Sequence, residues 1–125
     1  MIVVDASAFL DAADGRRAVI DRLAGEDIHA PHLLDVEVAS ALRRLVATGR
    51  VGAPDALGVL GVLQQADIRR HPHQPLLPII WSLRDRVSAY DATYVALATA
   101  LDATLVTTDR RLASIAGLPC VIEVP

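Results

Sequence analysis

The 125-residue sequence has the length of a single domain, and a hydrophobic fraction of 53% excludes an intrinsically disordered chain. A formal net charge of −3 excludes nucleic-acid binding through an overall positive field, so a bound polyanion must be held by local basic groups. All 12 basic residues are arginines, which excludes lysine Schiff-base chemistry and a phosphate-loop lysine.

Cysteine usage and apolar runs indicate the expected compartment. The single cysteine, Cys120, excludes a disulfide framework and a thiolate metal cluster. No apolar segment reaches the roughly 20 residues of a membrane span, and the N-terminus lacks the basic flank of a signal peptide. We therefore expect one cytoplasmic domain, residues 1–125, with no membrane partner.

The first predicted element is a strand at residues 2–4. Ile2, Val3 and Val4 are consecutive β-branched residues, which suits a strand buried on both faces of a parallel sheet. Asp5 then lies at the carboxyl end of this strand, where open α/β sheets have their ligand crevices.

Helices and strands alternate along the rest of the chain. Apolar spacing and capping residues predict a turn or short helix at 8–13 and helices at 15–25, 33–47, from 54 onward, around 79–81, at 89–100 and at 109–116. Further strands are predicted at 28–30, 68–71, 104–107 and 121–124. Strands separated by helices pair in parallel through right-handed crossovers, so the predicted class is α/β.

Four acidic residues occupy equivalent places in this layout. Asp5 ends the first strand, Glu37 lies in the opening turns of the helix after the second, Asp91 lies in the first turn of the helix before the fourth, and Asp109 follows the fourth. A helix that follows a parallel strand begins at the carboxyl edge of the sheet, where the strand ends. A helix that precedes a parallel strand also begins there, because it runs antiparallel to that strand. All four carboxylates are therefore expected at one edge.

These carboxylates require compensation. Glu37 flanks an apolar stripe, and Asp91 shares an i, i+4, i+7 row with Val95 and Ala98 on an otherwise apolar helix, so both are expected to lean inward. Unpaired buried charges are costly and neighbouring carboxylates raise one another's pKa. Because the chain has no lysine, a divalent cation is the predicted partner.

The predicted ligands are all oxygen atoms, which favours Mg²⁺, with Mn²⁺ as a substitute, over Zn²⁺. Ser7 and Thr107 can hydrogen-bond the ligating carboxylates or a bound water. A hard cation with open positions suits phosphodiester hydrolysis, because it binds the phosphate and lowers the pKa of a water. The alternative is structural: Ser88 with Asp91 is also a capping box, and Asp109 is a possible N-cap.

The motifs resemble those of the PIN domain family, and within it the VapC-type toxins of toxin–antitoxin pairs. The resemblance rests on four segments in the family's order, at residues 3–7, 34–43, 90–98 and 105–109. It implies a three-layer α/β/α sandwich and a Mg²⁺- or Mn²⁺-dependent endoribonuclease that hydrolyses RNA. It also implies a homodimer and a cognate antitoxin that occupies the active-site groove.

The residues that match the family's acidic, catalytic metal-site residues are Asp5, Glu37, Asp91 and Asp109. The resemblance also implies that Ser7 and Thr107 provide the supporting hydroxyls. One departure is Ser40, where many relatives have Asn one turn after the glutamate. That change removes a polar support of Glu37 and leaves the acidic set intact.

Other functions remain open from the sequence. Within the family, a housekeeping RNA-processing nuclease is the alternative to a toxin. Outside it, the alternatives are a phospho-acceptor module, whose usual lysine is absent, and a non-catalytic binding partner. The arginines nearest to the acidic set are candidate phosphate contacts; they are Arg43, Arg44, Arg110 and Arg111.

Overall fold

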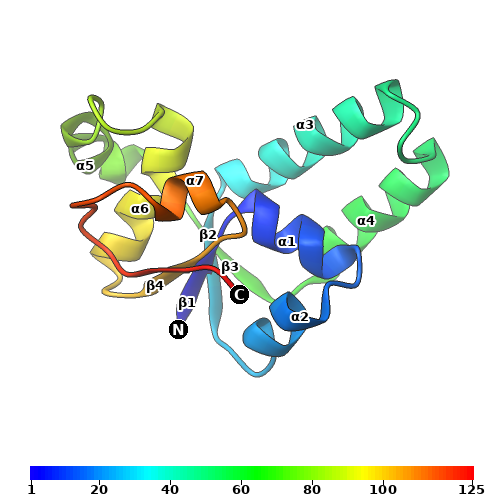
Figure 1. The fold of residues 1–125 in the computed structure, drawn as a ribbon, viewed down its shortest axis with the longest axis horizontal. Coiled ribbons are helices and arrows are strands. Elements are labelled where there is room, and N and C mark those ends of the chain that lie inside the picture. Colours follow the sequence, from blue (N-terminus) through cyan, green and yellow to red (C-terminus); the bar gives the residue numbers. More distant parts are fainter.

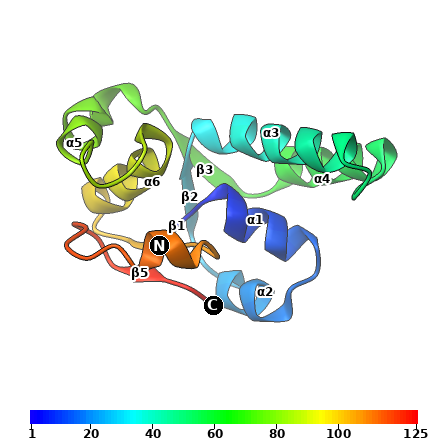
Figure 2. The same ribbon diagram turned by 45° about the horizontal axis from the view of Figure 1, so that its top comes forward.

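The computed structural model describes residues 1–125 as three layers, with a five-stranded sheet between two groups of helices (Figures 1 and 2). The strands are β1 (Ile2–Val4), β2 (Ile28–Pro31), β3 (Ile68–His71), β4 (Thr104–Val106) and β5 (Ile122–Glu123). Their order is β3-β2-β1-β4-β5, and every pairing is parallel. The predicted α/β class with a parallel sheet is confirmed.

The helices divide between the two faces of the sheet according to the direction in which the chain moves. They are α1 (Ala6–Ala13), α2 (Arg17–Leu23), α3 (Leu33–Ala47), α4 (Ala53–Gln65), α5 (Leu77–Ser82, preceded by a 3₁₀ turn), α6 (Ala89–Ala100) and α7 (Arg110–Ala113). From β1 to β3 the chain moves one way, and α1 to α4 lie on one face (Figure 1). The crossover from β3 to β4 reverses direction, and α5 and α6 lie on the opposite face, as right-handed crossovers require.

This strand order creates a topological switch point between β1 and β4. The two strands are neighbours, with Ile2 opposite Thr104 and Val4 opposite Val106. From β1 the chain continues to β2 and from β4 it continues to β5, which lie in opposite directions across the sheet. Ligand crevices of open α/β sheets form outside the carboxyl ends of strands at such points. The residues that follow β1 and β4 are therefore the first place to look for a functional site.

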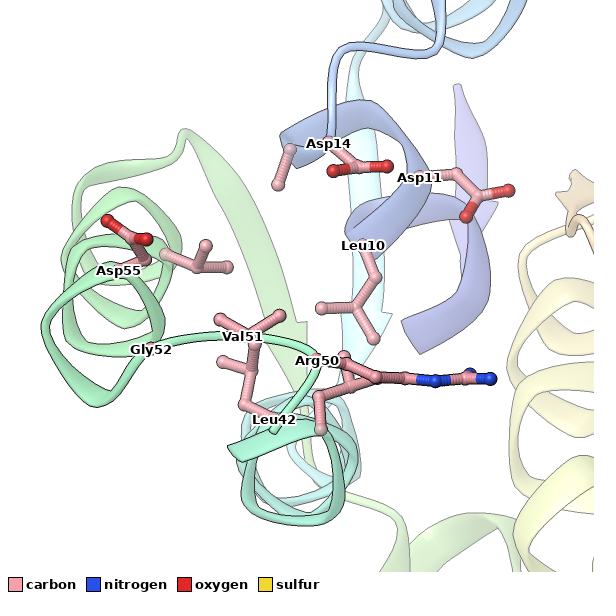
Figure 3. A pocket seen from close by; sticks show the side chains of 11 residues that line it. Leu10, Asp11, Asp14, Leu42, Arg50, Val51, Gly52 and Asp55 are labelled. Atoms are coloured by element: carbon pink, nitrogen blue, oxygen red, sulfur yellow. The ribbon is translucent and has the colours of Figure 1, made fainter. Parts of the chain in front are cut away.

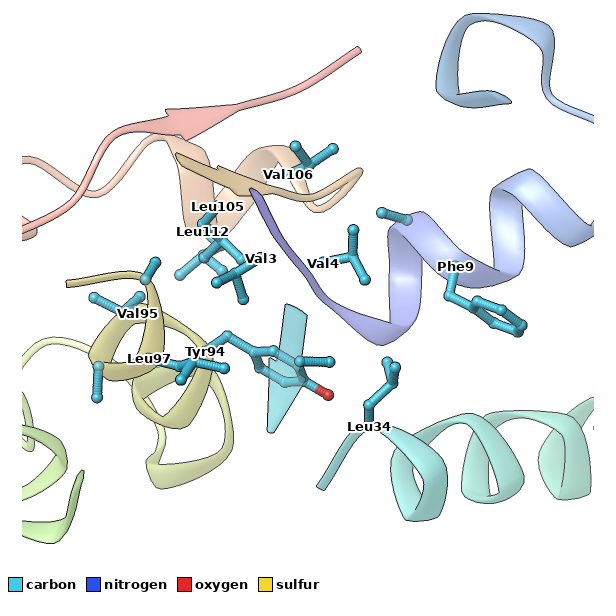
Figure 4. Close-up of a cluster of buried hydrophobic side chains, with 14 of the residues drawn as sticks. Val3, Val4, Phe9, Leu34, Tyr94, Val95, Leu97, Leu105, Val106 and Leu112 are labelled. Atoms are coloured by element: carbon cyan, nitrogen blue, oxygen red, sulfur yellow. The ribbon is translucent and has the colours of Figure 1, made fainter. Parts of the chain in front are cut away.

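The core surrounds the central strand β1, whose three residues are all buried. Helix α6 covers it with a run of seven buried residues, from Ala92 to Ala98. Figure 4 shows Val3 and Val4 of β1 among side chains from α6, β4 and the start of α3. Burial on both faces explains why β1 is apolar throughout instead of alternating.

Several predicted boundaries are wrong by a few residues. The first helix begins at Ala6 because Asp5 caps it, the 15–25 helix spans Arg17–Leu23, and the 109–116 helix shrinks to Arg110–Ala113. The last strand is two residues long and lies at an edge of the sheet, where it pairs only with β4. None of the helices is both long and apolar enough to cross a lipid bilayer.

Candidate active site

Asp5 is the most tightly held of the predicted site residues. It is 7% exposed and lies between the end of β1 and the start of α1. Its Oδ1 accepts hydrogen bonds from the Ser7 hydroxyl (2.7 Å) and the Ala8 amide (2.9 Å), and its Oδ2 accepts from the Thr107 hydroxyl. Three donors therefore fix both oxygens of one buried carboxylate.

The two hydroxyls connect the turn after β1 to the turn after β4. Ser7 Oγ and Thr107 Oγ1 lie 3.1 Å apart, but each has one proton, and both protons point at Asp5. Their lone pairs instead accept the backbone amides of Thr108 and Asp109, each at 3.0 Å. The predicted supporting positions of Ser7 and Thr107 beside an acidic residue agree with this geometry.

Asp91 and Asp109 both lie at helix N-termini. The amide of Asp91 donates to the hydroxyl of Ser88, which is the N-cap of α6. Asp109 is the N-cap of α7 and accepts from the amides of Arg111 and Leu112. The guanidinium of Arg111 also lies between the two carboxylates, 3.5 Å from Asp91 and 3.3 Å from Asp109. The structural roles predicted for Ser88 and Asp109 are therefore present, and the same two carboxylates share one exposed cation.

Glu37 is the least constrained member of the set. It lies in α3 one turn after the buried Leu34 and is itself half-buried. Its carboxylate makes no short hydrogen bond and no ion pair, although the Tyr94 hydroxyl and the positive charge of Arg44 are near enough to favour its ionised form. Sequence phase predicted its inward lean, and the structure adds that the Tyr94 hydroxyl is the one hydrogen-bond donor that acts on this carboxylate.

Three of the four carboxyl groups are held in conditions that oppose ionisation. Burial, reinforced by the charge of Asp91, raises the pKa of Asp5 despite its three donors. Burial also raises the pKa of Glu37, with contributions from Asp91 and Asp5. Burial raises the pKa of Asp91, where Arg111 opposes the shift and Asp109 adds to it. Asp5 and Glu37 respond to the charge of Asp91, and Asp91 responds to that of Asp109, so the carboxylates are coupled through Asp91.

The donor set fits a hydrated divalent cation better than a fully enclosed one. No three Asp, Glu, His or Cys side chains are grouped closely enough to enclose an ion on their own. Mg²⁺ keeps several waters and is held through one or two carboxylates, so a tight cage is not required. The hydroxyl of Tyr94 points into the same region without any hydrogen-bond partner. An oxygen-rich, partly open site with uncompensated charge matches the needs of such an ion.

The sequence did not predict the roles of two residues beside the site. The expectation that the carboxylates lack cationic partners is wrong for Asp91 and Asp109, because Arg111 reaches back over the first turn of α7. Its position two residues after Asp109 was visible in the sequence, but the direction of its side chain was not. Tyr94 is a core residue, 2% exposed, and its hydroxyl faces the acidic group because it lies one turn after Asp91 on α6.

A further groove of the surface contains none of the four carboxylates. It is a groove of about 630 Å³ between α1 and the α3–α4 hairpin (Figure 3). Its apolar floor includes Leu10, Leu42 and Val51, and its rim includes Asp14, Asp55 and Arg50. This composition suits a partly apolar partner surface better than a phosphate backbone.

The sequence matches the family model described as PIN domain over residues 2–118. The chain belongs to the PIN domain family. This PIN domain is 48% identical to "Ribonuclease VapC1" of Mycobacterium tuberculosis, in an alignment that covers 97% of this chain and 95% of the relative. The resemblance predicted from four motifs is therefore confirmed over nearly the whole chain.

Solved structures give the same fold. A structure of PAE2754 from Pyrobaculum aerophilum superposes on this PIN domain with a TM-score of 0.75 and 26% identity, covering 97% of this chain and 82% of the other. A toxin–antitoxin complex from Klebsiella pneumoniae gives a TM-score of 0.68 at 17% identity, covering 98% and 97%. The predicted three-layer arrangement around a parallel sheet is the fold of both.

Proposed function

We propose that this PIN domain is a divalent-metal-dependent endoribonuclease and the toxin of a VapBC-type pair, with residues 1–125 forming one nuclease domain. The proposed catalytic and metal-binding residues are Asp5, Glu37, Asp91 and Asp109, with Mg²⁺ as the cofactor and Mn²⁺ as a substitute. The observation that carries the proposal is the set of four acidic side chains at one sheet edge, three with a raised pKa. Similarity to a chain named a ribonuclease supports RNA as the substrate.

The chain's own residues divide the work. Asp5, fixed by three donors, provides a carboxylate of constant orientation, while Glu37 and Asp91 supply negative charge from two other elements. A bound divalent cation supplies Lewis-acid chemistry, polarising the phosphodiester and offsetting developing charge. Arg44 and Arg111 are placed at the border of the site, where a guanidinium suits a phosphate oxygen.

The direct test is RNA cleavage by the purified protein with and without divalent metal. We expect cleavage with Mg²⁺ or Mn²⁺, loss on chelation and recovery when metal is restored. Mapping the cut ends of cellular RNA after induced expression then separates a toxin with few targets from an RNA-processing enzyme with one precursor. Undiminished cleavage in the presence of a chelator contradicts the metal-dependent assignment.

We propose a protein antitoxin as the partner of the groove between α1 and the α3–α4 hairpin. The apolar floor and acidic rim of that groove favour an amphipathic segment with basic side chains. A fold shared with the toxin–antitoxin complex from Klebsiella pneumoniae is consistent with this partner. A homodimer stays a prediction, for which the exposed Leu77 and Trp81, one turn apart on α5, offer an apolar surface.

Replacing Arg111 by Gln is expected to tighten Mg²⁺ binding by up to roughly fivefold, because an exposed ion pair contributes little and its loss removes a competing cation. Arg111 now lies between Asp91 and Asp109, where it both neutralises and crosslinks them. Calorimetric titration of the metal measures the change. Arg110→Gln is the matched control, since this neighbour makes no ion pair with either carboxylate. Weaker binding by the Arg111 variant would show that the guanidinium organises the site instead.

A further inference from the structure

The strongest unexplained feature of the core is the hydroxyl of Tyr94. The side chain is 2% exposed, and its oxygen is the one buried side-chain polar atom without a hydrogen-bond partner. Figure 4 shows the ring extending from α6 across the core toward Leu34 at the start of α3. A buried hydroxyl without a partner is destabilising compared with a phenylalanine ring of the same shape, so packing alone does not account for tyrosine here.

The surroundings of this hydroxyl are the acidic set. Glu37 lies one turn after Leu34 on α3, and the Tyr94 hydroxyl is near enough to its carboxylate for the two groups to act on each other's pKa as hydrogen-bond partners. Burial raises the pKa of the phenol, and the neighbouring Glu37, Asp5 and Asp91 raise it further. The phenol of Tyr94 therefore stays protonated, and its O–H is a hydrogen-bond donor that faces several carboxylate acceptors.

Glu37 is the acceptor that lacks support. Asp5 has three donors, and Asp91 and Asp109 share Arg111, whereas Glu37 has no ion pair and no short hydrogen bond, and Tyr94 is the one donor that acts on it. Ser40, the next polar side chain one turn along α3, is exposed and makes no hydrogen bond to it. A ligating carboxylate needs a hydrogen-bond partner to hold its orientation, and Tyr94 is the buried donor that faces this one.

We propose that Tyr94 is a positioning residue whose hydroxyl donates a hydrogen bond to the Glu37 carboxylate and holds it in orientation to bind the divalent cation. The proposal rests on the proposed function, since it concerns the same metal site. It assigns to α6 a second contribution, one turn beyond Asp91, made from within the core and without contact to the RNA.

The test is Mg²⁺ affinity of Tyr94→Phe, measured by calorimetry beside the melting temperature of the metal-free protein. We expect binding about tenfold weaker, the lower end of the range for supporting hydrogen bonds of metal ligands, with an unchanged or higher melting temperature. Tyr90→Phe is the matched control, because it removes a phenol hydroxyl from the same helix at a position that is 62% exposed. It is expected to match the wild type in both measurements.

A double-mutant cycle tests whether Tyr94 acts through Glu37. In a Glu37→Gln background, Tyr94→Phe should cause little further loss of Mg²⁺ affinity, whereas independent effects would add. Wild-type affinity in Tyr94→Phe, or additive losses, overturns the positioning role while leaving the nuclease assignment intact. Absence of Mg²⁺ binding by the wild-type protein overturns both, so the two failures are distinguishable.

Discussion

Replacing Asp5 by Asn is expected to lower RNA cleavage by at least roughly a thousandfold, because several kcal/mol of charge stabilisation depend on a correctly held cation. The fold should survive. An asparagine oxygen can still accept from the Ala8 amide and the Ser7 hydroxyl, and the Thr107 hydroxyl can rotate to accept from the new amide group. Cut-end mapping and circular dichroism of the same preparation measure both effects.

Asp102→Asn is the matched control for this substitution. Asp102 is exposed, follows α6 at the opposite end from Asp91, and has a positive φ of 50°. Asparagine tolerates this left-handed conformation as well as aspartate does, so the change alters charge and little else. Cleavage by Asp5→Asn at the Asp102→Asn rate would remove Asp5 from the active site.

The same substitution is expected to stabilise the metal-free protein at neutral pH. Burial raises the pKa of Asp5 above its usual 3.8, so the folded state binds its proton more tightly than the unfolded chain does. Stability from this group is complete below 3.8 and is lost as the pH rises through the higher folded-state value. With a chelator present, the melting temperature of Asp5→Asn should therefore exceed that of the wild type at about pH 7, and the difference should shrink toward about pH 4.

The coupling of the two effects has a physical origin. A carboxylate that is clamped by Ser7, Ala8 and Thr107 but poorly solvated is unfavourable in the metal-free protein and favourable for holding a cation. A variant that is more stable and inactive indicates a group kept for function. A variant that is less stable and inactive would instead indicate that Asp5 matters mainly as the cap of α1.

The sequence was sufficient to predict the elements whose signal is local. Three adjacent β-branched residues predicted β1, and the Ser88 cap predicted the start of α6. Strand β3 had a weak pattern because it is an edge strand that includes Arg69 and Arg70, so a continuous apolar run is not required there. Parallel topology then placed the acidic residues at one edge, without any knowledge of distances.

The contacts that long side chains make between different helices and strands could not be predicted from the sequence. Asp35 has a side chain that is 42% exposed, and yet Arg70 from another element binds it. Arg111 was recognised as a neighbour of Asp109, but its approach to Asp91 depends on how α7 packs beside α6. Tyr94 lay in an apolar run that predicts core packing, and only the fold shows where its hydroxyl points.

Replacing Arg70 by Ala is expected to lower the free energy of unfolding by about 2 kcal/mol, which for a chain of this size is a decrease of roughly 5–10 °C in melting temperature. The guanidinium of this β3 residue donates three hydrogen bonds to Asp35 of α3, at 2.8 to 3.1 Å. It also donates to the carbonyls of Leu63 in α4 (2.9 Å) and Ile68 (3.1 Å). One side chain thus joins the edge of the sheet to both helices of the α3–α4 hairpin.

The magnitude follows from partial exposure. The Asp35 side chain is 42% exposed, so water screens the ion pair and its loss contributes little by itself. The larger part comes from two carbonyl oxygens left without this donor.

Arg69→Ala is the matched control, because that neighbouring side chain is 71% exposed and its one ion pair, with Asp27, is 3.5 Å long. Its effect should stay below about 0.5 kcal/mol. Chemical denaturation compares the two variants, and equal stabilities would mean that the α3–α4 hairpin is held to the sheet by apolar packing alone.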